Sequence, residues 1–142
     1  MILPDLNLLV YAYNSDAPDH LGARSWWEAV LTEPRPVALP WAVNLGFLRL
    51  MTSRSVLVEP LSASEAIEVI RSWLARPQVR ILQPGPGHLD LVDELAKAAG
   101  KAGSLTTDIH LAALAIEHGA EVHTNDGDFK RFPGLRWTNP LA

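Results

Sequence analysis

Four aspartates have positions that suit metal chemistry. Asp5 follows a short apolar start, and Asp108 interrupts the apolar face of a helix. Asp126 and Asp128 share a turn near the C-terminus. Carboxylates that converge repel one another, so such a cluster needs a cation or a retained proton. Hard oxygen ligands in a chain without cysteine suit Mg²⁺ or Mn²⁺, and a site of this kind supports metal-assisted phosphodiester hydrolysis.

Asp108 belongs to an expected amphipathic helix over residues 106–118. At about 100° per residue, its side of the helix is otherwise apolar, and it carries Leu111, Ala112, Ala115 and Ile116. The opposite side is expected to be solvated, and it carries His110, Ala113 and Glu117. A carboxylate on the apolar side is costly unless something compensates its charge. The structural alternative is a first-turn acid that favours the helix dipole.

The other acids follow two expected strands, at residues 1–4 and 121–124. The carboxyl ends of parallel strands lie at the same edge of a sheet, and α/β proteins bind their ligands at this edge. Asp5 would then lie beside Asp126 and Asp128, and a carboxylate from a nearby helix would complete the cluster. Asp5 could instead serve only as the N-cap of the helix that follows it.

The remaining elements alternate between strand and helix along the whole chain. The expected strands lie at 1–4, 37–40, 79–82, 121–124 and 135–137, and the expected helices at 6–13, 20–32, 41–53, 62–76, 88–99 and 106–118. Ser62 and Glu65 form a capping box at the start of the fourth helix. This alternation indicates an α/β fold, with a mostly parallel sheet of four to five short strands covered on both faces. We expect a single domain over residues 1–142.

Composition excludes several classes of protein. The chain has 142 residues, 48% of them hydrophobic, and no cysteine, which rules out disulfides and thiolate zinc sites. It shows neither a signal peptide nor a membrane-length apolar run, so we expect a cytoplasmic protein without membrane contact. The net charge of −4 argues against a general nucleic-acid binder. The four candidate metal-binding aspartates account for all four net negative charges. The net charge is therefore still compatible with a metal-dependent enzyme that acts on nucleic acid.

Other polar and aromatic residues have simpler interpretations. The five histidines lack the spacing of a zinc motif. The five tryptophans are expected mainly in the core, although Trp26, Trp27 and Trp41 could line a groove for a partner helix. Arg49 is either a solvated helix residue or a bidentate phosphate ligand.

The sequence resembles the PIN-domain nucleases, and among them the VapC toxins of bacterial toxin–antitoxin pairs. The resemblance covers nearly the whole chain and rests on five segments in order, at 5–12, 20–27, 44–50, 107–115 and 124–135. It implies a PIN-like three-layer α/β/α sandwich and a magnesium-dependent endoribonuclease, with Mn²⁺ as an alternative metal. It also implies cleavage of specific RNA, such as tRNA or rRNA, and inhibition by a cognate VapB-like antitoxin. A homodimer is expected.

The resemblance also implies roles for individual residues. Asp5, Asp108 and Asp126 correspond to metal ligands, and Asp126 also to the acid that holds metal-bound water. Asp128 would be a weaker helper. Thr124 would hydrogen-bond to one of these acids or to a substrate phosphate. Two further residues are candidates for contacting the substrate, namely Arg49 and Asn7.

One position departs from the family pattern. The wider PIN family places a glutamate on the third helix, and the nearest position here holds Asn44. Asn44 can orient water or bind a metal weakly without adding charge, which suits one metal better than two. A haloacid-dehalogenase-type phosphatase would need an acid where this chain has Asn7, and a receiver domain would need paired acids after the first strand. The main alternative function is a non-catalytic PIN-like module that binds RNA or an antitoxin.

Overall fold

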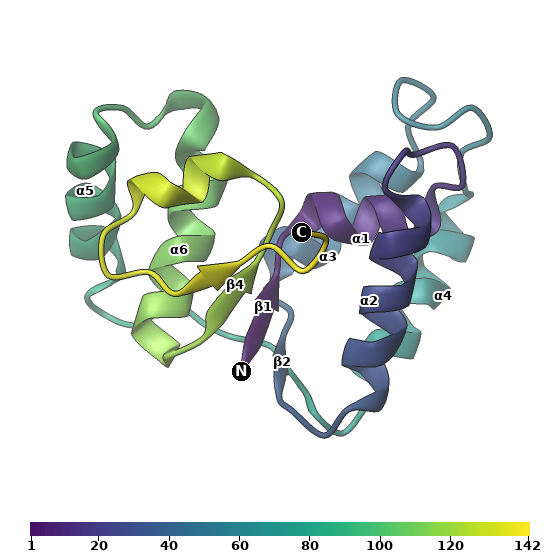
Figure 1. Cartoon of the computed structure of the whole chain (residues 1–142), viewed down its shortest axis with the longest axis horizontal. Coiled ribbons are helices and arrows are strands. Elements are labelled where there is room, and N and C mark those ends of the chain that lie inside the picture. Colours follow the sequence, from purple (N-terminus) through teal and green to yellow (C-terminus); the bar gives the residue numbers. More distant parts are fainter.

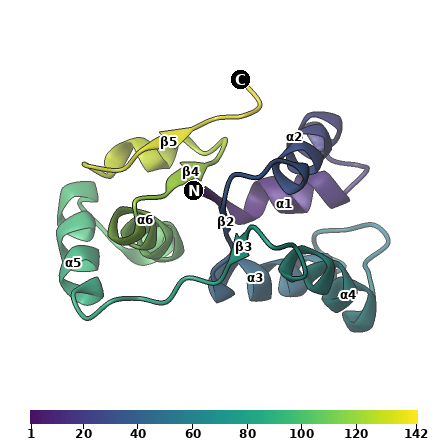
Figure 2. The same cartoon turned by 90° about the horizontal axis from the view of Figure 1, so that it is seen from below.

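The computed structural model describes all residues, 1–142, and shows one five-stranded sheet between two layers of helices (Figures 1 and 2). The strands are β1 (Ile2–Pro4), β2 (Val37–Ala38), β3 (Val79–Arg80), β4 (Glu121–His123) and β5 (Trp137–Thr138). Their order is β3-β2-β1-β4-β5, and every pairing is parallel. The predicted α/β/α sandwich with a parallel sheet is therefore confirmed.

The helices divide unequally between the two faces of the sheet. The helices are α1 (Leu6–Tyr13), α2 (His20–Thr32), α3 (Trp41–Met51), α4 (Ala63–Leu74), α5 (His88–Ala99) and α6 (Thr106–His118), with short 3₁₀ helices η1 (Gly103–Leu105) and η2 (Gly127–Arg131). In Figure 2, α1 to α4 lie on one side of the sheet and α5 and α6 on the other. No helix combines the length and apolarity needed to cross a membrane.

The strands are short because their apolar runs are short and buried on both faces. Ile2 and Leu3 of β1 are 3% and 0% exposed, and both residues of β2 are fully buried. The last strand is predicted at 135–137, but β5 begins two residues later, at Trp137. The left-handed Gly134 (φ 82°) keeps the chain in a turn, so pairing with β4 begins only at Trp137.

An aromatic cluster joins the four helices on the larger face. The ring of Phe47 on α3 lies 4.6 Å from that of Trp73 on α4, and Trp73 lies 5.5 Å from Trp27 on α2. Tyr13 of α1 completes the group, since its hydroxyl accepts a hydrogen bond from the Trp73 indole at 2.9 Å. Trp27 is thus a core residue as the sequence predicts, and it is not an exposed groove residue.

One expectation about α6 is wrong. The side with His110, Ala113 and Glu117 is not solvated, because α5 packs across it. Ala113 is fully buried, and Nε2 of His88 on α5 lies 2.9 Å from Nδ1 of His110. The His88 ring also contacts the Glu117 carboxylate at 2.6 Å. Helix α6 is therefore buried on two sides, by the sheet and by α5.

The capping box predicted at the start of α4 is present. The Ser62 hydroxyl accepts from the Glu65 backbone N–H at 3.1 Å, and the Glu65 carboxylate accepts from the Ser62 N–H at 3.0 Å. A close approach also fixes α3 against the start of α1. A Cβ added at Gly46 would lie 2.5 Å from a terminal methyl of Leu6. Glycine at position 46 therefore allows α3 to pack against the residue that follows Asp5.

Candidate active site

The carboxyl ends of β1 and β4 bring Asp5 and Thr124 together. The strands pair in parallel with Pro4 opposite His123, so the next residue of each chain segment lies at the same edge. The Asp5 N–H donates to the His123 carbonyl at 2.8 Å. The Thr124 hydroxyl donates to Oδ2 of Asp5 at 2.7 Å, and both residues are buried. The expected hydrogen bond from Thr124 to one of the acids is therefore present.

The Thr124 hydroxyl also organises the turn that follows β4. Its oxygen accepts from the Asp126 backbone N–H at 2.9 Å. Oδ1 of Asp126 in turn accepts from the Asp128 N–H at 2.8 Å and caps η2. This is the local pattern by which aspartate side chains stabilise turns. One buried hydroxyl thereby links Asp5 to the segment that carries the two C-terminal acids.

Asp108 meets the C-terminal acids from the first turn of α6. One carboxylate oxygen of each of Asp108, Asp126 and Asp128 lies within 4.8 Å of the others, and all three residues are partly exposed. Asp5 is not one of these three, although its charge, with those of Asp126 and Asp128, raises the pKa of Asp108. Asp5 is only 4% exposed, and one of its oxygens accepts from Thr124. The structure thus brings Asp128 into the same group as Asp108 and Asp126, and its expected role as a weaker helper stays a prediction.

The electrostatics of the cluster reflect burial and mutual repulsion. Burial and the negative charges of Asp5, Asp126 and Asp128 raise the pKa of Asp108 to about 7. Burial, together with the charge of Asp126, also raises the pKa of Asp5 above its usual range. The Thr124 hydroxyl and the N–H groups at the start of α1 oppose that rise. A carboxyl with a pKa this high, beside other acids, is typical of a functional site.

The structure also locates the residues expected to contact a substrate. Asn7 is exposed in the first turn of α1, two positions after Asp5. Arg49 is exposed in the last turn of α3 and forms no ion pair. Sequence reasoning missed Arg131, whose Nε lies 3.4 Å from Oδ1 of Asp128. The three-residue spacing of Asp128 and Arg131 is the signal that could have identified this pair.

Asn44 is buried beside the same sheet edge. Its Nδ2 donates to the carbonyl of Leu39, the residue after β2, at 3.1 Å. The side chain is fully buried, and its Oδ1 has no partner in the protein.

Comparisons with known proteins agree with this fold and identify the family. The PIN-domain sequence model matches residues 2–135. Ribonuclease VapC33 of Mycobacterium tuberculosis is 45% identical over 141 residues, which cover 99% of each chain. Ribonuclease VapC37 of the same organism is 35% identical over 100% of this chain and 99% of its own. These matches define the class of this α/β/α sandwich as a PIN domain. The chain belongs to the PIN-domain family of VapC ribonucleases.

Solved structures show the same fold at lower identity. VapBC2 from Rickettsia felis, bound to a fragment of its promoter DNA, matches with a TM-score of 0.70 at 21% identity, covering 98% of both chains. VapC20 of Mycobacterium tuberculosis, a toxin that cleaves the sarcin–ricin loop, matches with a TM-score of 0.63 at 19% identity. It covers 96% of this chain and 99% of its own. These structures confirm the fold, and the full-length identity to VapC33 and VapC37 confirms the resemblance to the VapC family.

Proposed function

We propose that this ribonuclease cleaves specific RNA, such as tRNA or rRNA, with one divalent cation, Mg²⁺ or Mn²⁺, at its acidic cluster. The observation that carries the proposal is the convergence of Asp108, Asp126 and Asp128 within 4.8 Å. Three oxygen ligands, from the first turn of α6 and the turn after β4, fit a hard cation, with its remaining positions free for water and phosphate oxygens. Asp5 supports the site from its buried position beside the three.

A cation held there would polarise the scissile phosphate and offset the negative charge that develops on it. The chain's own residues prepare this site. Thr124 fixes Asp5 and the turn of Asp126, so the carboxylates are held in place before a ligand arrives. Since the pKa of Asp108 is about 7, cation binding near neutral pH releases a proton from that carboxyl. Arg49 and Asn7 are proposed to contact the RNA backbone.

We further propose that the chain is a toxin held inactive by a cognate VapB-like antitoxin. Full-length identity to VapC ribonucleases supports this assignment, as does the shared fold of VapB–VapC complexes. An RNA substrate implies action in the cytoplasm. A homodimer is proposed as well, because Trp41 and Leu45, one turn apart on α3, are 46% and 56% exposed and a second copy could cover them.

The proton released on cation binding gives a prediction about pH. We expect the rise in melting temperature caused by Mg²⁺ to grow between pH 6 and pH 8, around the pKa of Asp108 of about 7. Below that pKa protons compete with the cation, and above it the carboxylate is already ionised. Differential scanning fluorimetry at each pH measures the melting temperature in Mg²⁺ minus that in EDTA. Groups that titrate without affecting cation binding contribute equally to both values and cancel. A Mg²⁺ effect that is constant over this range would contradict the proposed ligand.

RNA cleavage tests the proposed function directly. We expect the purified chain to cut total bacterial tRNA and rRNA at a few discrete positions with Mg²⁺ or Mn²⁺, and EDTA to abolish the cuts. Sequencing of the new 5′ ends would identify the target. Asp90→Asn is the matched control, because Asp90 also lies in the first turn of a helix but is exposed and is not among the charges that raise the pKa of Asp108. If RNA binds without divalent-dependent cuts, the chain is the non-catalytic module instead.

A further inference from the structure

Arg131 is the one cationic side chain that forms an ion pair with the acidic cluster. Its Nε lies 3.4 Å from Oδ1 of Asp128, one of the three carboxylates that converge within 4.8 Å. No other lysine or arginine pairs with these three carboxylates. The side chains of Arg131 and Asp128 are 49% and 45% exposed, so a large ligand such as RNA can reach both.

Buried neighbours fix the backbone of Arg131 beside the acids. Phe129 and Phe132 are 0% and 3% exposed, and their rings pack edge to face at 5.6 Å. At the other end of η2, Asp126 caps the helix by accepting from the Asp128 N–H at 2.8 Å. Arg131 therefore lies on the same short helix as Asp128, and a binding group on a fixed element loses less freedom when it binds a ligand.

The guanidinium of Arg131 also keeps most of its donors free. Its contact with Asp128 uses Nε, and the hydrogen bonds made by arginine side chains in this protein do not include Arg131. The two terminal nitrogens are therefore available to a ligand. A guanidinium binds phosphate through two parallel N–H groups, a geometry that lysine cannot provide.

We propose that Arg131 is a substrate-binding residue, whose terminal nitrogens bind an RNA phosphate at the acidic cluster. This inference rests on the proposed function, because it requires a cation and RNA at the same site. Arg131 then has two opposite effects. Its charge repels a cation before RNA arrives, and it attracts the phosphate afterwards. An arginine that only neutralises Asp128 on the surface would have no effect on RNA binding.

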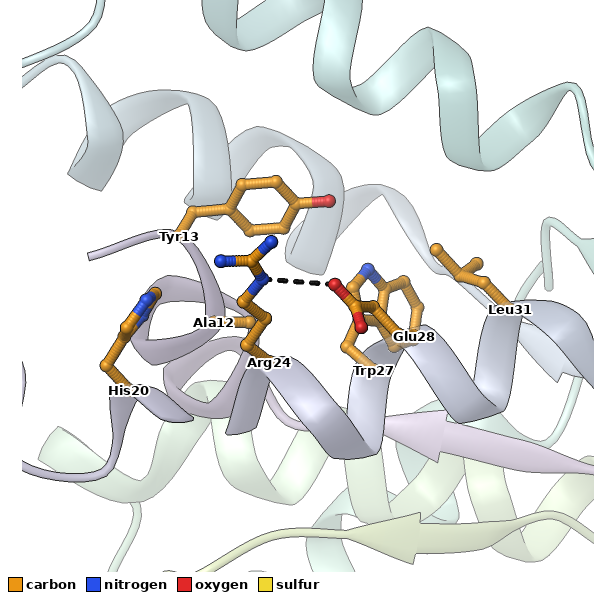
Figure 3. A pocket seen from close by; sticks show the side chains of 7 residues that line it. All are labelled: Ala12, Tyr13, His20, Arg24, Trp27, Glu28 and Leu31. Carbon is orange, nitrogen blue, oxygen red and sulfur yellow. Dashed lines mark hydrogen bonds and ion pairs between the residues drawn. The ribbon is translucent and has the colours of Figure 1, made fainter. Parts of the chain in front are cut away.

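Cation binding by the RNA-free protein tests the first effect. We expect Arg131→Gln to bind Mn²⁺ about threefold more tightly in isothermal titration calorimetry, since an exposed ion pair of Asp128 is lost. Arg24→Gln is the matched control, because Arg24 also pairs through Nε with an exposed carboxylate, that of Glu28 at 3.0 Å. Figure 3 shows this pair beside a pocket of about 400 Å³ that none of the four aspartates lines. Arg24→Gln should leave the Mn²⁺ affinity unchanged.

RNA binding tests the second effect. The probe is a fluorescent 20-nucleotide single-stranded RNA of random sequence, because contacts to phosphate do not depend on sequence. Anisotropy is measured with Ca²⁺ in place of Mg²⁺, under conditions that leave the RNA uncut. We expect Arg131→Gln to weaken binding by about tenfold, because a hydrogen-bonded charge pair is lost. The slope of log affinity against log salt should fall in magnitude by about 0.7, the value for one phosphate contact on a single strand.

Arg131→Lys separates the charge from the shape of the side chain. Lysine keeps the positive charge, so the salt slope and the Mn²⁺ affinity should stay close to those of wild type. It lacks the planar fork, so RNA should bind about threefold more weakly. This pattern differs from that of Arg131→Gln and does not arise from a loss of stability, which melting curves of both variants check.

Three results would overturn the proposal. One is an RNA affinity and salt slope in Arg131→Gln that equal those of wild type. Another is an equal loss of RNA binding in Arg24→Gln, which would show a general effect of surface charge. The third is an unchanged or lower Mn²⁺ affinity in Arg131→Gln, which would make Arg131 a support of the η2 turn. A wild-type protein that binds the RNA but never cuts RNA would refute the ribonuclease assignment alone, because the binding effects of Arg131→Gln are measured without cleavage.

Discussion

Asp108→Asn should reduce RNA cleavage by roughly 10²–10³-fold while leaving the fold intact. Asparagine keeps the shape of the side chain but removes one of the three converging charged ligands. Cleavage of the identified RNA in Mg²⁺, measured as an initial rate at saturating enzyme, gives the size of the loss. Replacing Mg²⁺ with Mn²⁺ should restore little of the lost cleavage rate, because the substitution removes a negatively charged ligand.

The same substitution should stabilise the protein in EDTA. Burial and three neighbouring acids raise the pKa of Asp108 to about 7 in the folded state, from an ordinary aspartate value of 3.8. A raised carboxyl pKa means that stability is lost as the pH rises from about 4 to about 7, so the cost is complete at pH 8. Asp108→Asn removes that cost, and its melting temperature in EDTA should exceed that of wild type by about 3 °C at pH 8 and match it near pH 4.

Two outcomes would contradict the assignment of Asp108. One is full cleavage by a well-folded Asp108→Asn protein prepared free of wild type. The other is equal loss of cleavage in Asp90→Asn, which would show that the assay responds to any first-turn acid. Lower stability of Asp108→Asn in EDTA at pH 8 would instead place Asp108 in a structural hydrogen bond, since repulsion could not then dominate.

Much of this site could be predicted from the positions of its residues directly after strands, because these positions depend only on local sequence and sheet topology. Asp5 and Thr124 each follow a strand, and parallel pairing of β1 and β4 places them side by side. Asp108 stood out because a carboxylate on an apolar helix face requires an explanation. These inferences need only the periodicity of each segment, so they do not depend on how the helices pack against the sheet.

The remaining features depend on packing that the sequence does not display. The relative positions of Asp5 and Asp128 depend on the single turn of η2 and on the hydrogen bond that draws Asp5 toward Thr124. The packing of α5 over His110 could not be predicted from the sequence of α6 alone. A helix face with some polar residues can contact either solvent or the polar side of another helix.

Thr124 should matter as much for the architecture of the site as any residue that contacts the metal. Its hydroxyl is the only side-chain donor to Asp5 and also the acceptor for the Asp126 N–H. Thr124→Val has nearly the same shape but removes the donor to the buried Asp5 carboxylate, which costs about 1–3 kcal/mol, and the acceptor of the part-buried Asp126 N–H, which costs less. We expect cleavage to fall by about 10–100-fold, the usual effect of removing a residue that orients metal ligands.

A pH profile separates this positioning role from a loss of stability. The Thr124 hydroxyl lowers the pKa of Asp5, so its removal should raise that pKa further. The acidic limb of the cleavage profile should therefore move to higher pH in Thr124→Val. Thr124→Ser keeps the hydroxyl and should restore both the rate and the profile, although the lost methyl group lowers stability by about 1 kcal/mol. If Thr124→Val melts earlier but cleaves RNA with an unchanged rate and pH profile, Thr124 supports the fold alone, and the acids are held in place by the backbone of the β4 turn.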